Sequence, residues 1–211
     1  MLAKHHDKIL CLLANDFSIS ELLENGIDYI KENYLILKLS GIAKPVEGNL
    51  KFYTGTDKLN AIFINNAKDG NLKVVKYLIS QGADIHAEDD LALRWSVTNG
   101  HLKVVKYLVS QGINIHVWDD YAFRGSASNG HLETVKYLVS QGANIHARNN
   151  EALRWSANNE YFKVVKYLAS KGADIYANNN EALQWSIENN HTEITKYLKS
   201  LKEKQNASKT P

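Results

Sequence analysis

The sequence predicts an all-α repeat solenoid, in which stacked helix–turn–helix units are joined by short connector loops. Three observations lead to this fold class: glycines and tyrosines recur at a fixed interval of 30 residues, each unit holds two segments with helical apolar spacing, and a short non-helical segment separates the units. The recurring residues are Gly82, Gly112, Gly142 and Gly172, and Tyr77, Tyr107, Tyr137, Tyr167 and Tyr197. Two helices of roughly ten residues cannot bury their apolar faces alone, so neighbouring units must stack.

The unit at residues 91–120 illustrates the elements in order. Its first helix has apolar or small residues at helical spacing from Ala92 to Val97 and ends at Asn99-Gly100, a pair that tolerates a left-handed backbone. The second helix, from Leu102 to Val109, has apolar residues at intervals of three and four and ends before Gly112. The remaining residues are too few for a third helix, so they form an extended connector or a tight hairpin.

The same pattern divides the chain into units. Five repeats occupy residues 61–90, 91–120, 121–150, 151–180 and 181–200, and the last of these is a C-terminal cap. Residues 1–60 contain partial echoes of the repeat, such as Glu47–Leu50, which resembles Asp69–Leu72. They are interpreted as two degenerate capping repeats. A small independent helical segment is the alternative. Residues 201–211 are polar and are expected to be a disordered tail.

The second half of each unit resembles the ankyrin repeat. The segments NGHLKVVKYL (Asn99–Leu108) and VSQGANIHA (Val139–Ala147) carry the likeness. The unit is shorter than the roughly 33 residues of that family, and Leu91–Arg94 stand where the family has Thr-Pro-Leu-His. This shortened 30-residue variant is similar to the ankyrin proteins that giant DNA viruses of amoebae encode. The resemblance implies a protein-binding module whose partner docks on the concave side, formed by connector tips and first helices.

The scarcity of proline follows from the same comparison. The chain has two prolines, whereas the family places a proline in the first turn of helix 1. Four residues stand just before the first helices here: Asp90, Asp120, Asn150 and Asn180. Aspartate and asparagine accept hydrogen bonds from free backbone N–H groups at a helix start, so we expect these side chains to be N-caps.

Composition excludes several classes of protein. With Lys+Arg 25 against Asp+Glu 23 and one cysteine, the chain has neither a strong net charge nor a disulfide framework. It shows no apolar run long enough to span a membrane and no signal peptide. We therefore expect an intracellular protein, cytoplasmic or nuclear, and in the host cell if the protein is viral.

No residues form a recognisable catalytic or metal-binding motif. Histidines recur at equivalent positions of successive repeats, but packed helices are about 8–10 Å apart, too far for one such series to converge on one zinc ion. We expect these histidines to hydrogen-bond between adjacent connectors or turns. The sequence predicts no enzyme, no metal and no cofactor.

Tryptophan and arginine also recur at equivalent positions of the first helix. Trp95, Trp155 and Trp185 are predicted to pack in the core, and Phe123 is expected to fill the space beside Gly125, which replaces tryptophan in its repeat. Trp118, in a connector, is either an interaction hot spot or an incidental packing residue. Arg94, Arg124 and Arg154 are expected to bind the cap residues Asp90, Asp120 and Asn150, with partner recognition as the alternative.

Positions that differ among repeats sharing one scaffold indicate a recognition surface. The candidate partner-binding residues are Glu88, Asp89, Thr98, Trp118, Asp119, Ser128, Arg148, Asn149, Asn158, Asn178 and Glu188. We expect a noncatalytic, monomeric scaffold that binds a protein partner there, a host target if the protein is viral. The alternative is binding of an anionic surface, nucleic acid or lipid, by the lysines of the second helices, although we do not expect nucleic acid or membrane to be the main partner.

Overall fold

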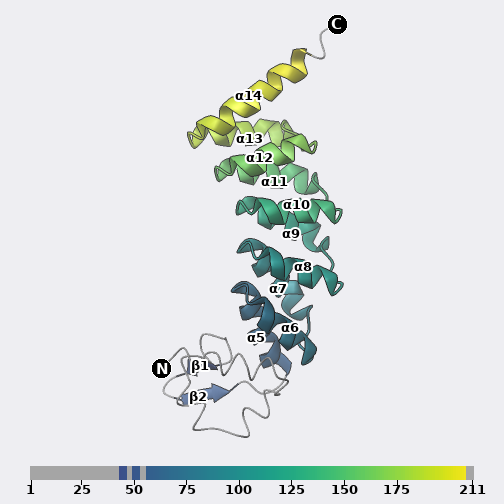
Figure 1. Cartoon of the computed structure of the whole chain (residues 1–211). Helices are drawn as coiled ribbons and strands as arrows, with labels where there is room; N and C mark the ends of the chain where they lie inside the picture. The colour runs from purple at the N-terminus through teal and green to yellow at the C-terminus, as the bar shows by residue number, and fades with distance from the viewer. Residues whose placement is uncertain (1–42, 47–48, 53–55, 208–211) are drawn as a thin grey trace. The chain divides into compact units, whose positions relative to one another are not determined.

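The structure, a computed structural model, describes residues 43–46, 49–52 and 56–207 (Figure 1). The chain divides into two compact units, Met1–Ala92 and Leu93–Pro211. Each unit is described by itself below, and helix α7 (Ala87–Thr98) contains the boundary between them. The first predicted capping repeat, residues 1–30, lies outside the described residues.

In the first unit, a β-hairpin precedes the described helices. Strands β1 (Ala43–Val46) and β2 (Asn49–Phe52) pair antiparallel, with Val46 opposite Asn49. Residues 43–46 and 49–52 are therefore strands, and not the helices that an ordinary repeat would have there. Pro45 explains part of the difference, because a proline disfavours the helical conformation of the residue before it. Helices α5 (Thr56–Lys68) and α6 (Leu72–Ser80) follow and pack against each other.

The second unit consists of stacked helix pairs. The first helices of the repeats are the end of α7, α9 (Val117–Ser128), α11 (Ala147–Asn158) and α13 (Ala177–Glu188). The second helices are α8 (Leu102–Ser110), α10 (Leu132–Ser140), α12 (Phe162–Ser170) and α14 (Thr192–Ala207). Helix α11 packs between α9 and α13, and α10 and α12 pack between α8 and α14. Figure 1 shows these two layers, and the all-α repeat solenoid is confirmed.

The core of the second unit repeats with the sequence. Leu108, Leu138, Leu168 and Leu198 occupy equivalent positions of the second helices and are buried. The first helices contribute Phe123 and Leu153, which are fully buried, together with small residues such as Ser126 and Ser156. At the C-terminal end, α14 continues through Ala207. The disordered tail predicted from residue 201 is therefore wrong for residues 201–207.

Near its start, each of the helices α7, α9, α11 and α13 contains a left-handed turn, after which the regular helix continues. Three consecutive residues have positive φ in every described connector: Glu88–Asp90, Trp118–Asp120, Arg148–Asn150 and Asn178–Asn180. Asparagine and aspartate tolerate this conformation better than other non-glycine residues do. The left-handed turn therefore explains why aspartate or asparagine recurs at its second and third residues.

Two of the four residues that were expected to cap the first helices, Asp120 and Asn150, join neighbouring connectors instead. Oδ1 of Asp120 accepts a hydrogen bond from the backbone N–H of Asn144 in the next repeat and lies 2.9 Å from Nδ1 of His116. Asn150 repeats this arrangement with the N–H of Asp174 and with His146. The predicted N-caps are wrong at these positions, because the left-handed turn directs the side chains toward the connector of the next repeat.

Histidines after the first helices join successive turns, as expected. Nε2 of His131 lies 2.8 Å from the carbonyl oxygen of Thr98, and Nε2 of His191 lies 2.8 Å from that of Asn158. Tyrosine replaces histidine in the repeat between them, and there the side chain of Asn159 donates to the carbonyl of Ser128. These bonds place the histidines in the scaffold and fix the spacing of the first helices.

Candidate functional site

In the second unit, the first helices and connectors form one side of the repeats, called the helix-1 side, and four large hydrophobic side chains are exposed on it. Trp118 is 61% exposed, Ile187 49%, Trp155 40% and Trp95 37%. Trp155 and Trp185 lie side by side on α11 and α13, with ring centroids 5.3 Å apart and planes inclined by 48°. The prediction that Trp95 and Trp155 are core residues is wrong, and Trp185 is only half-buried.

The helical pattern explains why these tryptophans face outward. In α11 the buried residues are Ala152, Leu153, Ser156 and Ala157, and Trp155 lies on the opposite side of that stripe. The equivalent position holds asparagine in the first repeat and glycine at 125. A core position rarely accepts such different volumes, so this variation was the signal that the sequence reasoning missed.

Gly125 also corrects the expectation for Phe123. A Cβ at Gly125 would lie 3.5 Å from the ring of Tyr121 and 3.8 Å from Val97, with no atom of Phe123 among its nearest neighbours. Phe123 is fully buried in the core. Tyr121, one helical turn earlier, covers the space beside the glycine. This repeat therefore has its aromatic ring at position 121, whereas three other repeats have a tryptophan at the position equivalent to 125.

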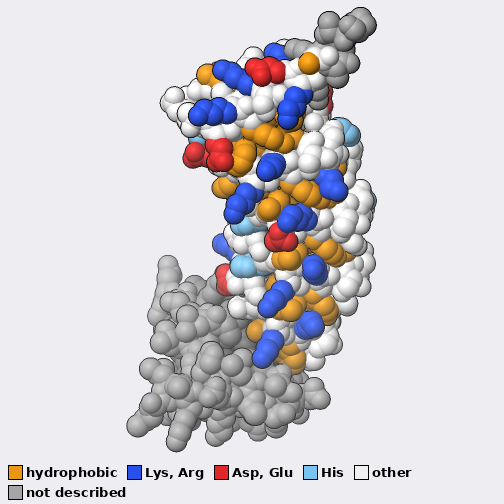
Figure 2. Space-filling view, turned by 45° about the horizontal axis from the view of Figure 1, so that its top comes forward, with side chains coloured by type: hydrophobic (Ala, Val, Ile, Leu, Met, Phe, Trp, Pro, Cys, Tyr) orange, Lys and Arg blue, Asp and Glu red, His pale blue; other side chains and the backbone are white. Residues whose placement is uncertain are grey.

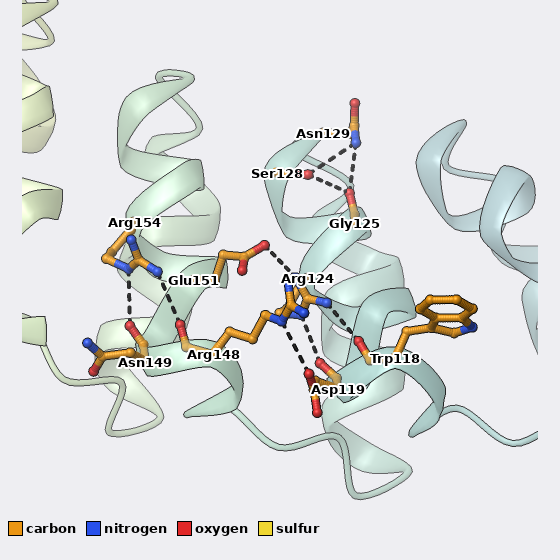
Figure 3. Close-up of polar contacts among 10 residues, drawn as sticks. All are labelled: Trp118, Asp119, Arg124, Gly125, Ser128, Asn129, Arg148, Asn149, Glu151 and Arg154. Carbon is orange, nitrogen blue, oxygen red and sulfur yellow. Dashed lines mark hydrogen bonds and ion pairs between the residues drawn. The ribbon is translucent and has the colours of Figure 1, made fainter. Parts of the chain in front are cut away.

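Arg124 connects the left-handed turn of its own repeat to the next repeat. Its Nε donates to the carbonyl of Asp119 over 2.8 Å and its Nη2 to the carbonyl of Trp118 over 2.7 Å (Figure 3). Nη1 lies 2.5 Å from Oε1 of Glu151, and the Arg124 side chain is 6% exposed. Arg124 was expected to bind the side chain of Asp120. Its partners are instead these two carbonyls and the carboxylate of Glu151, so the predicted bond to Asp120 is wrong.

Arg154 and Gln184 repeat the arrangement. Arg154 donates to the carbonyls of Asn149 and Arg148 and forms an ion pair with Glu181, and Gln184 donates to the carbonyl of Asn179. Partial burial acts to raise the pKa of Glu181, but hydrogen bonds from Asn178 and Arg154 and the charge of Arg154 outweigh it, so the pKa lies below its usual value. Glu181 is therefore held ionised within the scaffold.

The connectors bring two of the sequence candidates together. Nε of Arg148 lies 3.2 Å from Oδ2 of Asp119, which belongs to the connector of the adjacent repeat. The Trp118 indole points away from this pair in Figure 3. An open cavity of about 330 Å³ adjoins the pair. Its lining residues are Asp119, Asp120, Asn144, His146, Ala147 and Arg148. The connector tips thus combine an exposed indole with a charged, hollowed surface.

The other candidates fall into two groups. Glu88, Asp89, Asn149, Asn178 and Glu188 are exposed, the first four on left-handed turns and Glu188 at the end of α13. Thr98, Ser128 and Asn158 are half-buried, and their carbonyls accept the bonds that join successive turns. The exposed group is available to a partner, whereas the half-buried group supports the scaffold.

The opposite side, formed by the second helices and called the helix-2 side, is rich in lysine. In the second unit, all charged residues at the second and fifth positions of the second helices are exposed: Lys103, Lys106, Glu133, Lys136, Lys163, Lys166, Glu193 and Lys196. Lys73 and Lys76 of α6, in the first unit, are exposed as well. Figure 2 shows a face on which Lys and Arg are frequent and Asp and Glu are few. Lys136 pairs with Glu133 over 2.7 Å, and Nζ of Lys106 lies 5.4 Å from the Tyr137 ring centroid.

The described part of the chain offers neither a metal site nor a membrane span. Among those residues, no three side chains of histidine, cysteine, aspartate or glutamate lie together in a way that would hold a metal ion. No helix of that part combines the length and the apolar character that crossing a membrane requires.

Comparison with protein families agrees with this architecture. A family model described as ankyrin repeats (3 copies) matches residues 29–119 and 123–210. The matched residues make up more than half of the chain and cover the described helices of the repeats except residues 120–122 of α9. Ankyrin repeats are general protein–protein interaction modules, and the family is typically a noncatalytic scaffold. The chain belongs to the ankyrin-repeat family.

Proposed function

We propose that this protein is a noncatalytic module that binds one protein partner through its helix-1 side. The exposed tryptophans of the second unit are the observation that carries the proposal. Trp95, Trp118 and Trp155 all belong to first helices or connectors. Tryptophan is enriched among residues that dominate binding energy at protein interfaces, and exposing it to water is unfavourable without a partner.

The scaffold supports this use of the helix-1 side. Ion pairs from Arg124 to Glu151 and from Arg154 to Glu181 fix the orientation of adjacent first helices. Binding to a prearranged surface loses less conformational entropy than binding to a mobile one. The partner would therefore meet indoles and connector tips that are already in position. A host protein as partner, and a viral origin of the chain, rest on the likeness of the 30-residue unit to viral ankyrin proteins.

Binding of a purified partner to matched variants tests the proposal. Trp155→Ala and Trp118→Ala should each weaken the affinity by about 10-fold or more if the indole is a hot spot, which corresponds to about 1.4 kcal/mol or more. Lys163→Ala, on the helix-2 side of the same repeat as Trp155, is the control and should change it less than about 3-fold. Affinities that respond to Lys163 and not to the tryptophans would refute the proposal.

The lysines of the helix-2 side support a second candidate function, binding of an anionic surface. Their exposure along successive second helices favours it. Counterion release predicts that retention on duplex DNA or on anionic lipid vesicles would fall steeply with salt. Lys103→Gln combined with Lys163→Gln should then reduce retention, whereas Trp155→Ala should not. Solubility alone also accounts for these lysines, so we place this function second.

A further inference from the structure

The tryptophan pair of α11 and α13 is a defined feature of the helix-1 side. Trp155 and Trp185 occupy equivalent positions of adjacent repeats, and their rings are in contact at 5.3 Å between centroids. Trp155 keeps 40% of its surface exposed despite this contact. Two indoles on neighbouring rigid helices offer more aromatic surface than one, and the α11–α13 packing fixes their separation.

The arginines near this pair already have partners. Arg124 binds Glu151 and two carbonyls, Arg154 binds Glu181 and two carbonyls, and Arg148 binds Asp119. Each of these guanidinium groups is thereby matched by a carboxylate of a neighbouring repeat. The described lysines of the second unit lie on the second helices or directly after them, as Lys171 does.

An acidic residue next to the pair has no such match. Glu188 lies three residues after Trp185 on α13, a spacing that places two side chains on the same helical face. Its side chain is exposed, and among the described residues no Lys or Arg lies within ion-pair distance of it. The surface around the tryptophan pair thus combines aromatic faces with an uncompensated negative charge.

We infer that this surface binds a basic segment of the protein partner, with an arginine or lysine side chain lying against Trp155 and Trp185 and its charge balanced by Glu188. The inference rests on the proposed function and adds the chemistry of the partner. Tryptophan is the aromatic side chain that attracts cations most strongly, and arginine also stacks on its plane. A neutral apolar partner would use the indoles but would leave Glu188 without a role.

A peptide titration observed at the indole N–H groups tests the inference. The probe is an acetylated tetra-arginine amide, and its comparison is the same peptide with citrulline, in which a neutral urea group replaces each guanidinium. The chain has 4 tryptophans, so the indole resonances distinguish the sites. Tetra-arginine should shift the resonances of Trp155 and Trp185 and leave that of Trp118 unchanged. Citrulline should bind about 3- to 30-fold more weakly.

Two pairs of variants control for net charge and folding. Glu188→Gln should weaken tetra-arginine binding about 2- to 5-fold, whereas Glu133→Gln, which changes the net charge equally on the helix-2 side, should not. Trp155→Ala should abolish the shift at Trp185, and an unchanged Trp118 resonance reports that the fold is intact. Equal binding of the citrulline peptide, or equal effects of both glutamine variants, overturns the inference. The proposed function fails separately, if a purified partner binds Trp155→Ala as well as the original chain.

Discussion

A single buried polar residue, Arg124, joins two repeats of the second unit. Its guanidinium satisfies two carbonyls of a left-handed turn and one carboxylate of the next repeat. Arg148 offers a natural comparison, since it makes an ion pair on the surface, where the side chains of Arg148 and Asp119 are 57% and 67% exposed. The two arginines carry the same charge and differ in burial.

Replacing these two arginines by alanine should separate the effects of burial and charge. Arg124→Ala leaves a partly buried Glu151 and two carbonyls without their donor, and it should lower the free energy of unfolding by about 2–4 kcal/mol. Arg148→Ala removes a solvated pair and should cost about 0–1 kcal/mol. Urea denaturation followed by circular dichroism measures both. Similar losses in the two variants would show that burial of Arg124 does not matter.

Glu181 makes part of this stability depend on pH. Because its folded-state pKa is lowered, the ionised form stabilises the fold above the pKa of the unfolded chain, and that contribution is lost as the pH falls through the folded pKa. The difference in unfolding free energy between the original chain and Glu181→Gln should therefore be largest at neutral pH and shrink in acid. The same series in an Arg154→Gln background should show a smaller pH-dependent difference. A difference that grows on acidification contradicts the assignment.

At the scale of the element, the turns that follow the helices depend on glycine for two separable reasons. Gly130 follows the first helix α9, Gly142 follows the second helix α10, and both have positive φ. A Cβ on Gly130 would lie 2.4 Å from the Tyr161 ring, whereas one on Gly142 would meet nothing within 4 Å. Gly130 therefore combines backbone strain with close approach, and Gly142 presents backbone strain alone.

Alanine at the two glycines should give unequal losses. Both substitutions force alanine into a left-handed conformation, at a cost of about 1–2 kcal/mol. Gly130→Ala should add about 1–3 kcal/mol, because the Tyr161 ring and the helix behind it must shift. Thermal or urea unfolding of the two variants checks the order. A larger loss for Gly142→Ala would mean that the contact with Tyr161 is relieved without cost.

The elements were also where sequence reasoning succeeded and failed most clearly. Helix pairs and their turns follow from 30-residue periodicity, because the apolar spacing that defines each helix is local. The left-handed turns were missed, since Asp120 and Asn150 before a helix suit both an N-cap and a positive φ, and only the position of the next connector decides between them. The hairpin at 43–52 was missed because the interpretation followed weak echoes of the repeat and did not consider Pro45.

At the scale of the whole molecule, the account rests on a difference between two sides of the repeats. The helix-1 side carries exposed indoles and arginines held by carboxylates, and the helix-2 side carries exposed lysines. The sequence predicted the lysines of the second helices, and Trp118, Asp119 and Arg148 stay predicted candidates for partner binding. Trp155 was misplaced in the sequence-based prediction, because a large apolar residue in a repeat is expected in the core. The variation among repeats at this position, and its place outside the buried stripe of α11, indicate an exposed residue instead.

The most direct test of the central claim is a covalent footprint of the chain with a purified partner bound. Tryptophan oxidation and lysine acetylation, quantified by mass spectrometry with and without the partner, report on the two sides in one experiment. We predict that Trp155 and Trp185 become protected while Lys103, Lys163 and Lys166 react as in the free chain. Protected lysines with unchanged tryptophan oxidation would contradict the claim that the helix-1 side is the binding surface.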